Sequence, residues 1–443
     1  MITLKVKKQL MEVMEMNINT LTEKIKNNEY IKTFRYLYGE NEKEIKRQNE
    51  RYLKAVESFS KIYPQRDEVR IFSAPGRTEI GGNHTDHQHG CVLAAAVNLD
   101  IIGIVAFHND GVIRIKSEGY DEFSVNLSEL EVQSGKKTSA DIVRGIAAKF
   151  AGMGVKVSGF DMYCISDVIG GSGISSSAAF ETLIGTIIDI CCNEGRAGAV
   201  EIAKIGQYAE NVYFDKKSGL MDQMVSSVGG LVAIDFENTD APVINSFRYD
   251  FEESGYSLCI TDTKGSHANL TDDYVAIRTE MEGVAHQFGK EYLREVSEDE
   301  FYEGFAELRE KCSDRSLMRA VHFFDENRRA VQEATALEEG NIEYFMTLVR
   351  QSGESSAELL QNLYSCSTPQ KQEIPLAIMM SKKFLKNKGA VRVHGGGFAG
   401  TIQAFVPLNE TEDYINKMDG IFGKGSCMKL RIRPVGGTEI ING

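Results

Sequence analysis

The stretch Gly170-Gly171-Ser172-Gly173-Ile174-Ser175-Ser176-Ser177 lies between an apolar run typical of a strand, 160–165, and an apolar run typical of a helix, 181–192. Glycines can adopt positive φ, which turns successive backbone N–H groups toward one point. The first turn of the following helix adds unpaired N–H donors and the positive end of its dipole. The stretch therefore predicts a phosphate-binding loop, although a flexible Gly/Ser linker would have the same composition.

Two common nucleotide-binding motifs are absent from this loop. No Lys follows the glycines, as the P-loop pattern G-x-x-x-x-G-K-[ST] requires. The loop also does not fit G-x-G-x-x-G with a ribose-binding acid at the usual distance. A nucleotide bound here would be held by a different construction.

The composition is that of an ordinary globular protein. The 443 residues are 42% hydrophobic and 26% charged, and the length predicts two or three domains with a large core. A net charge of −14 disfavours a nucleic-acid partner, whose phosphates would be repelled. It does not exclude ATP, because local cations outweigh a diffuse charge that salt screens.

The cysteines and apolar segments predict the compartment. The eight cysteines show no metal-type spacing, and no uninterrupted apolar stretch reaches the roughly 18 residues of a membrane span. The beginning of the sequence does not read as a signal peptide. We therefore expect a cytoplasmic protein with no membrane partner.

The pattern along the chain predicts α+β architecture with two lobes. Residues 1–55 read as helices with an apolar stripe at Leu10, Met14, Ile18, Leu21 and Ile25, which we expect to dock on the body of the same chain rather than on another subunit. A monomer is the expected state. Strands and helices then alternate, and a second half begins near residue 251. The expected strands are 69–73, 101–107, 111–116, 160–165, 231–235, 256–262, 391–394 and 402–406, and the expected helices are 139–150, 195–212, 273–288, 299–312, 313–339 and 341–363.

A second motif spans residues 73–90, Ser-Ala-Pro-Gly-Arg-Thr-Glu-Ile-Gly-Gly-Asn-His-Thr-Asp-His-Gln-His-Gly. Asn83, His84, Asp86 and His87 fall within five positions. Side chains of these types can recognise sugar hydroxyls, which both donate and accept hydrogen bonds. A solvated turn and a metal site built from the histidines are the alternatives.

Two carboxylates 12 residues apart, Glu210 and Asp222, form a third feature. Asp222 lies among apolar residues, where a carboxylate is costly without a partner, or it is a helix N-cap. Glu210 taken alone reads as a solvated helix residue. A second glycine-rich loop, 392–401, indicates either a close backbone approach or a tight turn.

Taken together and in this order, the motifs resemble those of the GHMP small-molecule kinases, and within them the galactokinase family. The stretch 76–87 is similar to G-R-x-N-[LIV]-I-G-E-H-T-D-Y, and 169–178 is similar to P-x-G-x-G-L-S-S-S-A, with Ile169 in place of the Pro. Residues 219–223 resemble G-I-M-D-Q, and the loop 394–400 resembles T-G-A-G-F-G-G. The segment from Asp262 through His267 to Tyr274 and Arg278 resembles D-T…H…Y-x-x-R.

The resemblance implies a fold and an activity. It implies a helical extension at 1–55, a ribosomal-protein-like lobe at 56–250 and a ferredoxin-like lobe at 251–443. The implied activity is that of an ATP- and Mg²⁺-dependent kinase that phosphorylates the anomeric hydroxyl of galactose. The implied roles are Asp222 as base, Arg77 as its cationic partner, Ser177 and Glu210 as Mg²⁺ ligands, Gly171, Ser172, Gly173, Ser175 and Ser176 as the phosphate cradle, and Asn83, His84, Asp86 and Tyr274 as sugar ligands.

Departures from the motif leave alternatives open. Asn83 replaces the Glu of the motif, Glu79 replaces its Asn, and His87 replaces its Tyr. A carboxylate on the sugar would be repelled by Glu but tolerated by Asn, so galacturonate or another galacto-configured sugar is the alternative substrate. A sensor without turnover is a further alternative, and the intact run 175–179 and Asp222 count against it.

Overall fold

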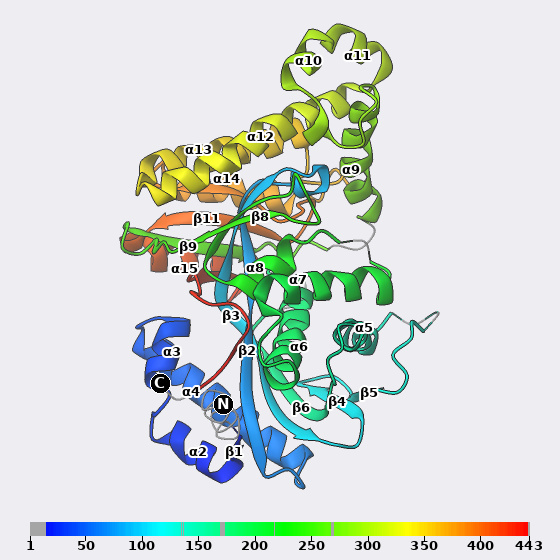
Figure 1. Ribbon diagram of the computed structural model, residues 1–443. Coiled ribbons are helices and arrows are strands. Elements are labelled where there is room, and N and C mark those ends of the chain that lie inside the picture. Colours follow the sequence, from blue (N-terminus) through cyan, green and yellow to red (C-terminus); the bar gives the residue numbers. More distant parts are fainter. Residues whose placement is uncertain are drawn as a thin grey trace.

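The computed structural model describes residues 15–133, 135, 137–168, 173–216, 218–266 and 270–441 (Figure 1). Within them the chain forms two β-sheets, each covered by helices, which confirms the α+β expectation. The first sheet has the order β1-β2-β3-β6-β4-β5, with β7 and β8 continuing from β3 and β13 pairing with β2. Its strands are β1 Met16–Asn17, β2 Glu68–Gly81, β3 Cys91–His108, β4 Val112–Ser117, β5 Phe123–Asn126, β6 Gly159–Ser166, β7 Leu231–Asp235, β8 Val243–Phe247 and β13 Thr438–Glu439.

The long pair β2 and β3 runs through the first lobe as its spine (Figure 1). Their antiparallel register shifts between Pro75 and Arg77 and again between Glu79 and Gly81, which are bulge-like irregularities. The expected end of this strand at Ser73 is wrong, because β2 continues to Gly81. Arg77 and Glu79 therefore lie on a strand rather than in a turn.

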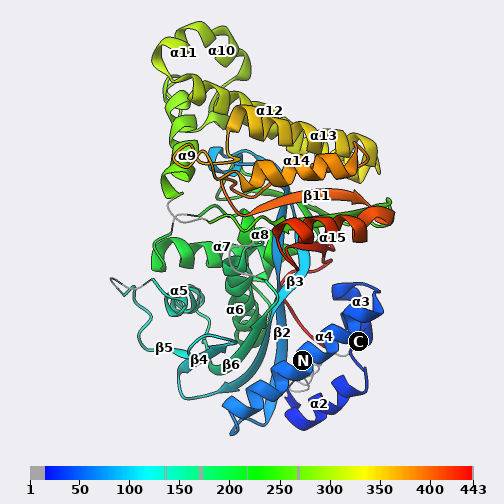
Figure 2. The same ribbon diagram turned by 180° about the vertical axis from the view of Figure 1, so that it is seen from behind.

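Helices cover both faces of this sheet. The helices are α2 Ile18–Lys26, α3 Ile31–Tyr38 and α4 Glu42–Ile62 on one face, and α5 Ser139–Gly152, α6 Ser176–Cys192, α7 Gly198–Tyr208 and α8 Met221–Val228 on the other side of the lobe (Figures 1 and 2). Side chains alternate along β3, so Ile102 and Ile104 pack on α2–α4 while Ile101 and Val105 pack on the opposite core.

The apolar stripe of the N-terminal helices docks on the same chain, as expected. Ile18, Leu21 and Ile25 are buried in the cluster that includes strand residues Ile102 and Ile104. Leu10 and Met14 lie outside the described residues.

The second lobe is built on an antiparallel sheet with the order β10-β11-β9-β12. Its strands are β9 Tyr256–Asp262, β10 Ala390–His394, β11 Thr401–Pro407 and β12 Cys427–Leu430, and its flanking helices are α12 Asp314–Glu338, α13 Ile342–Ser355, α14 Glu373–Leu385 and α15 Thr411–Phe422. Apolar residues of α14 and α15 pack on one face, and residues of α12 and α13 join the core of the other.

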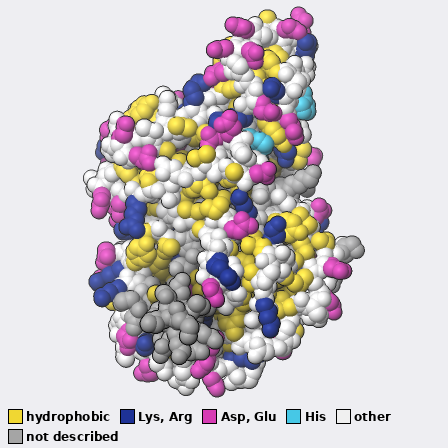
Figure 3. Space-filling view, in the orientation of Figure 1, with side chains coloured by type: hydrophobic (Ala, Val, Ile, Leu, Met, Phe, Trp, Pro, Cys, Tyr) yellow, Lys and Arg dark blue, Asp and Glu magenta, His cyan; other side chains and the backbone are white. Residues whose placement is uncertain are grey.

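A helical projection extends from this lobe. It comprises α9 Thr271–His286, α10 Glu298–Glu303 and α11 Phe305–Lys311, and the expected single helix 299–312 is wrong because the chain breaks between α10 and α11 at Gly304. Asp and Glu side chains gather over α10 and α11 (Figure 3), so part of the negative charge lies on the projection.

After β12 the chain returns to the first lobe, where β13 pairs with β2 through Thr438 opposite Ser73. On this return path Arg433 donates through Nη1 to Asp100 Oδ2 at 2.7 Å. The same fully buried carboxylate receives hydrogen bonds from Arg51 Nη1 of α4 at 2.6 Å and from the Tyr38 hydroxyl of α3 at 2.6 Å. The N-terminal helices, the sheet and the returning segment thus meet at Asp100.

Candidate active site

Two stretches that are far apart in the sequence converge on Asp222. Arg77 of β2 donates through Nε to Asp222 Oδ1 at 2.7 Å. The Ser175 hydroxyl, at the start of α6, donates to Asp222 Oδ2 at 2.6 Å. Both carboxylate oxygens are therefore held by donors, and the side chain is still 30% exposed.

The local backbone explains how Arg77 reaches this position. The Arg77 backbone N–H donates to the Ile174 carbonyl at 2.9 Å, which brings the end of the phosphate loop against β2. A Cβ at Gly76 would lie 2.7 Å from the same carbonyl oxygen, so the approach requires glycine there. The guanidinium also donates through Nη1 to the Gly173 carbonyl and thus bridges the loop and Asp222.

Ser175 and Asp222 are presented by the beginnings of two helices. Ser175 has φ +57° and ψ 70°, an uncommon left-handed conformation for a residue with a side chain, and α6 begins at the next residue. Asp222 lies in the first turn of α8, whose N-cap is Leu220. The N-cap interpretation of Asp222 is therefore wrong, and its partners are Arg77 and Ser175.

These partners keep Asp222 ionised. Burial by itself raises the pKa of the Asp222 carboxyl, but the Arg77 guanidinium and the hydrogen bonds from Arg77 and Ser175 outweigh it. The pKa therefore lies below its ordinary value. At neutral pH Asp222 is a carboxylate that can orient or accept a proton.

Asp222 opens onto a pocket of about 250 Å³. A Cβ at Gly219 would lie 2.7 Å from Asp86 Oδ2, so the absence of a side chain allows the two motifs to meet. The residues that line this sugar-sized pocket are Arg77, Glu79, His84, Asp86, His87, Glu210, Lys216, Ser218, Gly219, Met221, Asp222, Gln223, Gly395 and Gly396.

His84 joins this pocket to the second glycine-rich loop. It has φ +60°, and its Nε2 donates to the Gly396 carbonyl at 2.9 Å. Burial and the neighbouring His87 lower the pKa of His84 to about 3, so the imidazole is neutral at physiological pH. Among the described residues, no group of three or more His, Cys, Asp or Glu side chains could hold a metal ion, which counts against the histidine metal site.

Two further residues predicted to bind sugar lie behind the second glycine-rich loop. Asn83 is fully buried and donates through Nδ2 to the Gly395 carbonyl at 2.8 Å. The Tyr274 hydroxyl donates to the Gly397 carbonyl at 2.8 Å, and a Cβ at Gly396 would lie 2.6 Å from the Tyr274 ring. Neither side chain is among the residues that line the pocket.

A second, mainly apolar pocket of about 630 Å³ adjoins the first, and Glu210 lines both. A pocket with apolar walls and a few polar groups suits a flat aromatic ligand such as a nucleobase. Sequence reasoning did not identify these walls. Its lining residues are Ile101, Ser117, Glu118, Tyr120, Asp121, Phe123, Thr138, Ser139, Ala140, Ile142, Cys164, Ser166, Val168, Ser176, Ser177, Phe180, Glu181, Glu210 and Phe214.

Two buried carboxylates lie where the pockets meet. The Gln223 amide donates to Glu181 Oε2 at 2.9 Å and to Glu210 Oε2 at 3.0 Å. Burial and the charge of Glu210 raise the pKa of Glu181, whose Oε1 is buried without a hydrogen-bond partner among the described residues. Lys216 Nζ lies 2.6 Å from Glu210 Oε1. With the Ser177 hydroxyl, these oxygens form a donor set that suits a hard cation such as Mg²⁺.

The structure thus brings together most of the predicted site residues. Arg77, His84, Asp86, Asp222 and Glu210 surround the sugar-sized pocket, and Ser176 and Ser177 line the apolar pocket. Gly171 and Ser172 of the predicted phosphate cradle lie outside the described residues. Sequence reasoning missed Lys216 and Gln223 as pocket residues, and it noted Glu79 only as a departure from the motif.

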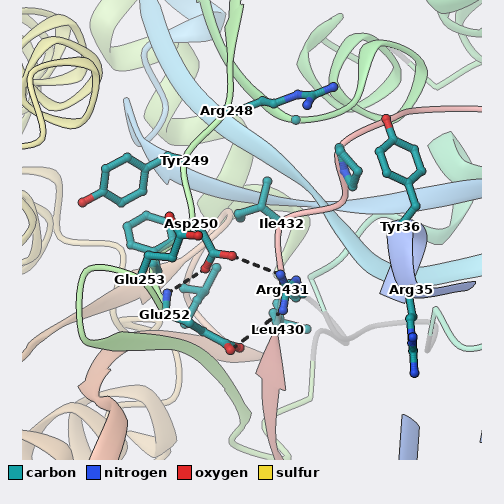
Figure 4. Close-up of a pocket in the computed structure, with 14 residues that line it drawn as sticks. Arg35, Tyr36, Arg248, Tyr249, Asp250, Glu252, Glu253, Leu430, Arg431 and Ile432 are labelled. Atoms are coloured by element: carbon teal, nitrogen blue, oxygen red, sulfur yellow. Dashed lines mark hydrogen bonds and ion pairs between the residues drawn. The ribbon is translucent and has the colours of Figure 1, made fainter. Parts of the chain in front are cut away.

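A third pocket, of about 400 Å³, lies where α3, the segment joining the lobes and the chain after β12 meet (Figure 4). Arg431 pairs with Asp250 at 3.0 Å and lies 3.8 Å from Glu252. Tyr36 and Arg248 line the same pocket, apart from these ion pairs (Figure 4). None of the motif residues lines this pocket. The pocket lies at a junction between parts of the fold and is separate from the candidate active site.

Comparison with known proteins agrees with this geometry. One family model, the GHMP kinases N terminal domain, matches residues 141–230, and another, the galactokinase galactose-binding signature, matches residues 57–107. The solved structure of Lactococcus lactis galactokinase complexed with galactose superposes with a TM-score of 0.74 at 22% identity, covering 86% of this chain and 98% of that chain. The fold and the site define a GHMP-type kinase.

Two curated relatives show to which family of GHMP-type kinases the chain belongs. The galactokinase of Actinobacillus pleuropneumoniae serotype 5b (strain L20) is 30% identical over 365 residues, which cover 81% of this chain and 90% of the relative. The galactokinase of Glaesserella parasuis serovar 5 (strain SH0165) is 31% identical over 352 residues, which cover 78% and 87%. The chain belongs to the galactokinase family.

Proposed function

We propose that this protein transfers the γ-phosphoryl group of ATP to the anomeric hydroxyl of galactose, giving α-galactose 1-phosphate and ADP. The observation that carries this proposal is the ionised Asp222, which opens onto a polar pocket while Arg77 connects it to the end of the phosphate loop. Phosphoryl transfer depends mainly on positioning and on charge compensation, and these groups supply both.

In the proposed reaction the sugar hydroxyl lies against Asp222. The carboxylate orients this hydroxyl and accepts its proton as the oxygen attacks the γ-phosphorus. The Arg77 guanidinium keeps Asp222 anionic before transfer and would offset charge on the transferring group. His84 and Asp86 line the same pocket and would fix the sugar ring.

The nucleotide would occupy the neighbouring pocket. Its apolar walls would hold the base, and the N–H groups at the start of α6, with Gly173, Ser175 and Ser176, would face the phosphates. Ser177 and Glu210 would hold Mg²⁺, which neutralises phosphate charge when it is bound. Lys216 pairs with Glu210 in the structure, so metal binding would compete with this ion pair or displace it.

We infer a monomer that acts in the cytoplasm, and all eight cysteines are free thiols, which suits a reducing compartment. No helix among the described residues combines the length and apolarity that a membrane span needs.

The decisive experiment is ADP release by purified protein with Mg·ATP and, separately, galactose, galacturonate, galactosamine, arabinose and glucose. We expect turnover with galactose at least about tenfold above the others, a difference of roughly 1.4 kcal/mol in the barrier. A preference for galacturonate would keep the catalytic assignment and change the substrate. No turnover with any sugar would overturn the proposal in favour of a sensor.

A further inference from the structure

Among the acidic residues that line the sugar-sized pocket, Glu79 is the one that belongs to β2. It is two residues from Arg77 in a stretch where β2 and β3 pair without a register shift, so the two side chains lie on the same face of the strand, about 6.6 Å apart along it. Arg77 pairs with Asp222, and Glu79 and Asp222 line the same pocket, so a sugar bound against Asp222 would lie next to Glu79.

The hydrogen bonds of Glu79 are concentrated on one oxygen. Oε1 accepts from Arg392 Nη2 at 2.6 Å and from Asn83 Nδ2 at 3.0 Å. The described residues give Oε2 no hydrogen bond, although the residue is only 5% exposed. Burial raises the pKa of Glu79, and the charges of Arg392 and Arg77 oppose this rise. A partly desolvated carboxylate oxygen without a donor is a place where a ligand hydroxyl would be favourable.

Asn83, in contrast, has no group left for a ligand. Its Nδ2 is used by Glu79 and by the Gly395 carbonyl, and its Oδ1 accepts from Asn362 Nδ2 at 2.9 Å and from the Ser356 hydroxyl at 3.3 Å. The residue is 0% exposed. Asn83 therefore holds Glu79 and the glycine-rich loop in place.

The two positions carry exchanged residue types relative to the motif that the chain resembles. That motif has Asn where this chain has Glu79, and Glu where it has Asn83. Because these two side chains contact each other, the exchange preserves an amide–carboxylate hydrogen bond and moves the negative charge onto the strand. The substitution at position 83 therefore does not leave the pocket without a carboxylate.

We propose that Glu79 is a specificity-determining residue whose Oε2 accepts a hydrogen bond from a hydroxyl of a neutral sugar and whose charge disfavours a sugar acid. This inference rests on the proposed function and deepens it, because it assigns galactose rather than galacturonate as the substrate class. It also assigns Asn83 a positioning role rather than contact with the sugar.

The test compares kcat and KM for galactose and galacturonate in four proteins: the native chain, Glu79→Gln, Glu79→Asp and the double exchange Glu79→Asn with Asn83→Glu. For Glu79→Gln we expect the KM for galactose to rise about tenfold with a smaller change in kcat, and the galactose-to-galacturonate ratio of kcat/KM to fall at least tenfold. Glu79→Asp keeps the charge and should keep the preference for galactose. The double exchange keeps an amide–carboxylate pair but moves the charge to position 83, which is buried behind the glycine-rich loop, so it should not restore the preference.

An unchanged ratio in Glu79→Gln, with a melting temperature like that of the native chain, would overturn the inference. If Glu79→Gln does not fold, loss of the galactose preference in folded Glu79→Asp would overturn it instead. If the native chain phosphorylates no sugar, the proposed function fails separately. Calorimetric titration of galactose in the presence of ADP then decides the role of Glu79, because the inference requires at least tenfold weaker binding by the Gln variant and equal affinity would refute it.

Discussion

Asp222 and Asp100 are two aspartates with similar partners and different surroundings. Each accepts hydrogen bonds from an arginine and a serine, and each carboxyl has a lowered pKa because these partners outweigh the effect of burial. Asp100 has a second arginine, Arg51, and is 0% exposed, whereas the Asp222 side chain remains 30% exposed in a pocket.

The surroundings of the two aspartates distinguish a structural charged cluster from a reactive one. The N-terminal helices pack on one side of Asp100 and the returning segment packs on the other, so its carboxylate is fully buried. Asp222 has the same kinds of hydrogen-bond donor, but its carboxylate opens onto the pocket, so a ligand can approach it. Openness, rather than the arginine–aspartate pair itself, separates a reacting group from a structural one.

The largest effect should come from Asp222→Asn, which preserves shape and removes charge and basicity. We expect turnover to fall by about 10²–10⁴-fold, because a positioned base contributes roughly that much. Sugar and ATP should still bind, and the melting temperature should change little. Steady-state ADP release and calorimetry measure the two effects, and near-normal turnover would refute the assignment of the base.

The matched change Asp100→Asn should lower stability and leave turnover nearly unchanged. It leaves the buried Arg433 guanidinium without a carboxylate and leaves Arg51 with Asp167 alone, and breaking a buried ion pair costs about 3–5 kcal/mol of the free energy of unfolding. Denaturant titration measures this loss. Turnover per folded molecule should stay close to that of the native chain, and a loss of turnover without a loss of stability would contradict the comparison.

A smaller effect is expected for Ser175→Ala, which removes one of the two donors to Asp222. We expect turnover to fall about tenfold, since a hydrogen bond to a charged group contributes about 1.5–3 kcal/mol. The acidic limb of the pH–rate profile should move to higher pH, because the pKa of Asp222 would be less depressed. Ser73→Ala beside Asp100 is the matched control and should leave this profile unchanged.

The smallest effect concerns pH between neutrality and about 5, where neither aspartate titrates. Burial lowers the pKa of His84, His322 and His394, which surround the second glycine-rich loop, so the folded state keeps them neutral. The unfolded chain takes up protons near its histidine pKa of about 6.5, and stability is therefore lost as the pH falls below that value. The raised pKa values of Glu181 and Glu333 act in the opposite direction, because these carboxyls take up protons in the folded state as the pH falls. The histidine contribution is therefore measured as a difference: His322→Gln should lessen the loss of melting temperature between pH 6.5 and 5, and an unchanged slope would contradict this expectation.

The expected core strands and most helices follow from apolar runs that are long and regular. β8, at Val243–Phe247, was missed because it is largely exposed and polar, and α14 was missed although Pro375 stands in its first turn, where proline is tolerated. The strand expected to end at Ser73 continues to Gly81, because the chain stays extended through Gly76, where the backbone closely approaches the phosphate loop.

The motifs of the site could be predicted from the sequence, but their arrangement in space could not. The residues alone did not join Arg77 to Asp222 across 145 positions, and the resemblance to known kinases supplied that pairing. The exchange between positions 79 and 83 was visible in the sequence, but only the structure turns Glu79 toward the pocket and buries Asn83. The expected boundary at residue 250 also separates β13 from the sheet in which it pairs.

The pairing of β13 with β2 has a consequence for the order in which the protein is made. β13 follows every strand of the second lobe in the sequence, so a ribosome releases the whole second lobe before it releases this partner of β2. Until then, Asp100 lacks the guanidinium of Arg433. The first lobe therefore completes its sheet and the cluster around Asp100 only after the second lobe has been made.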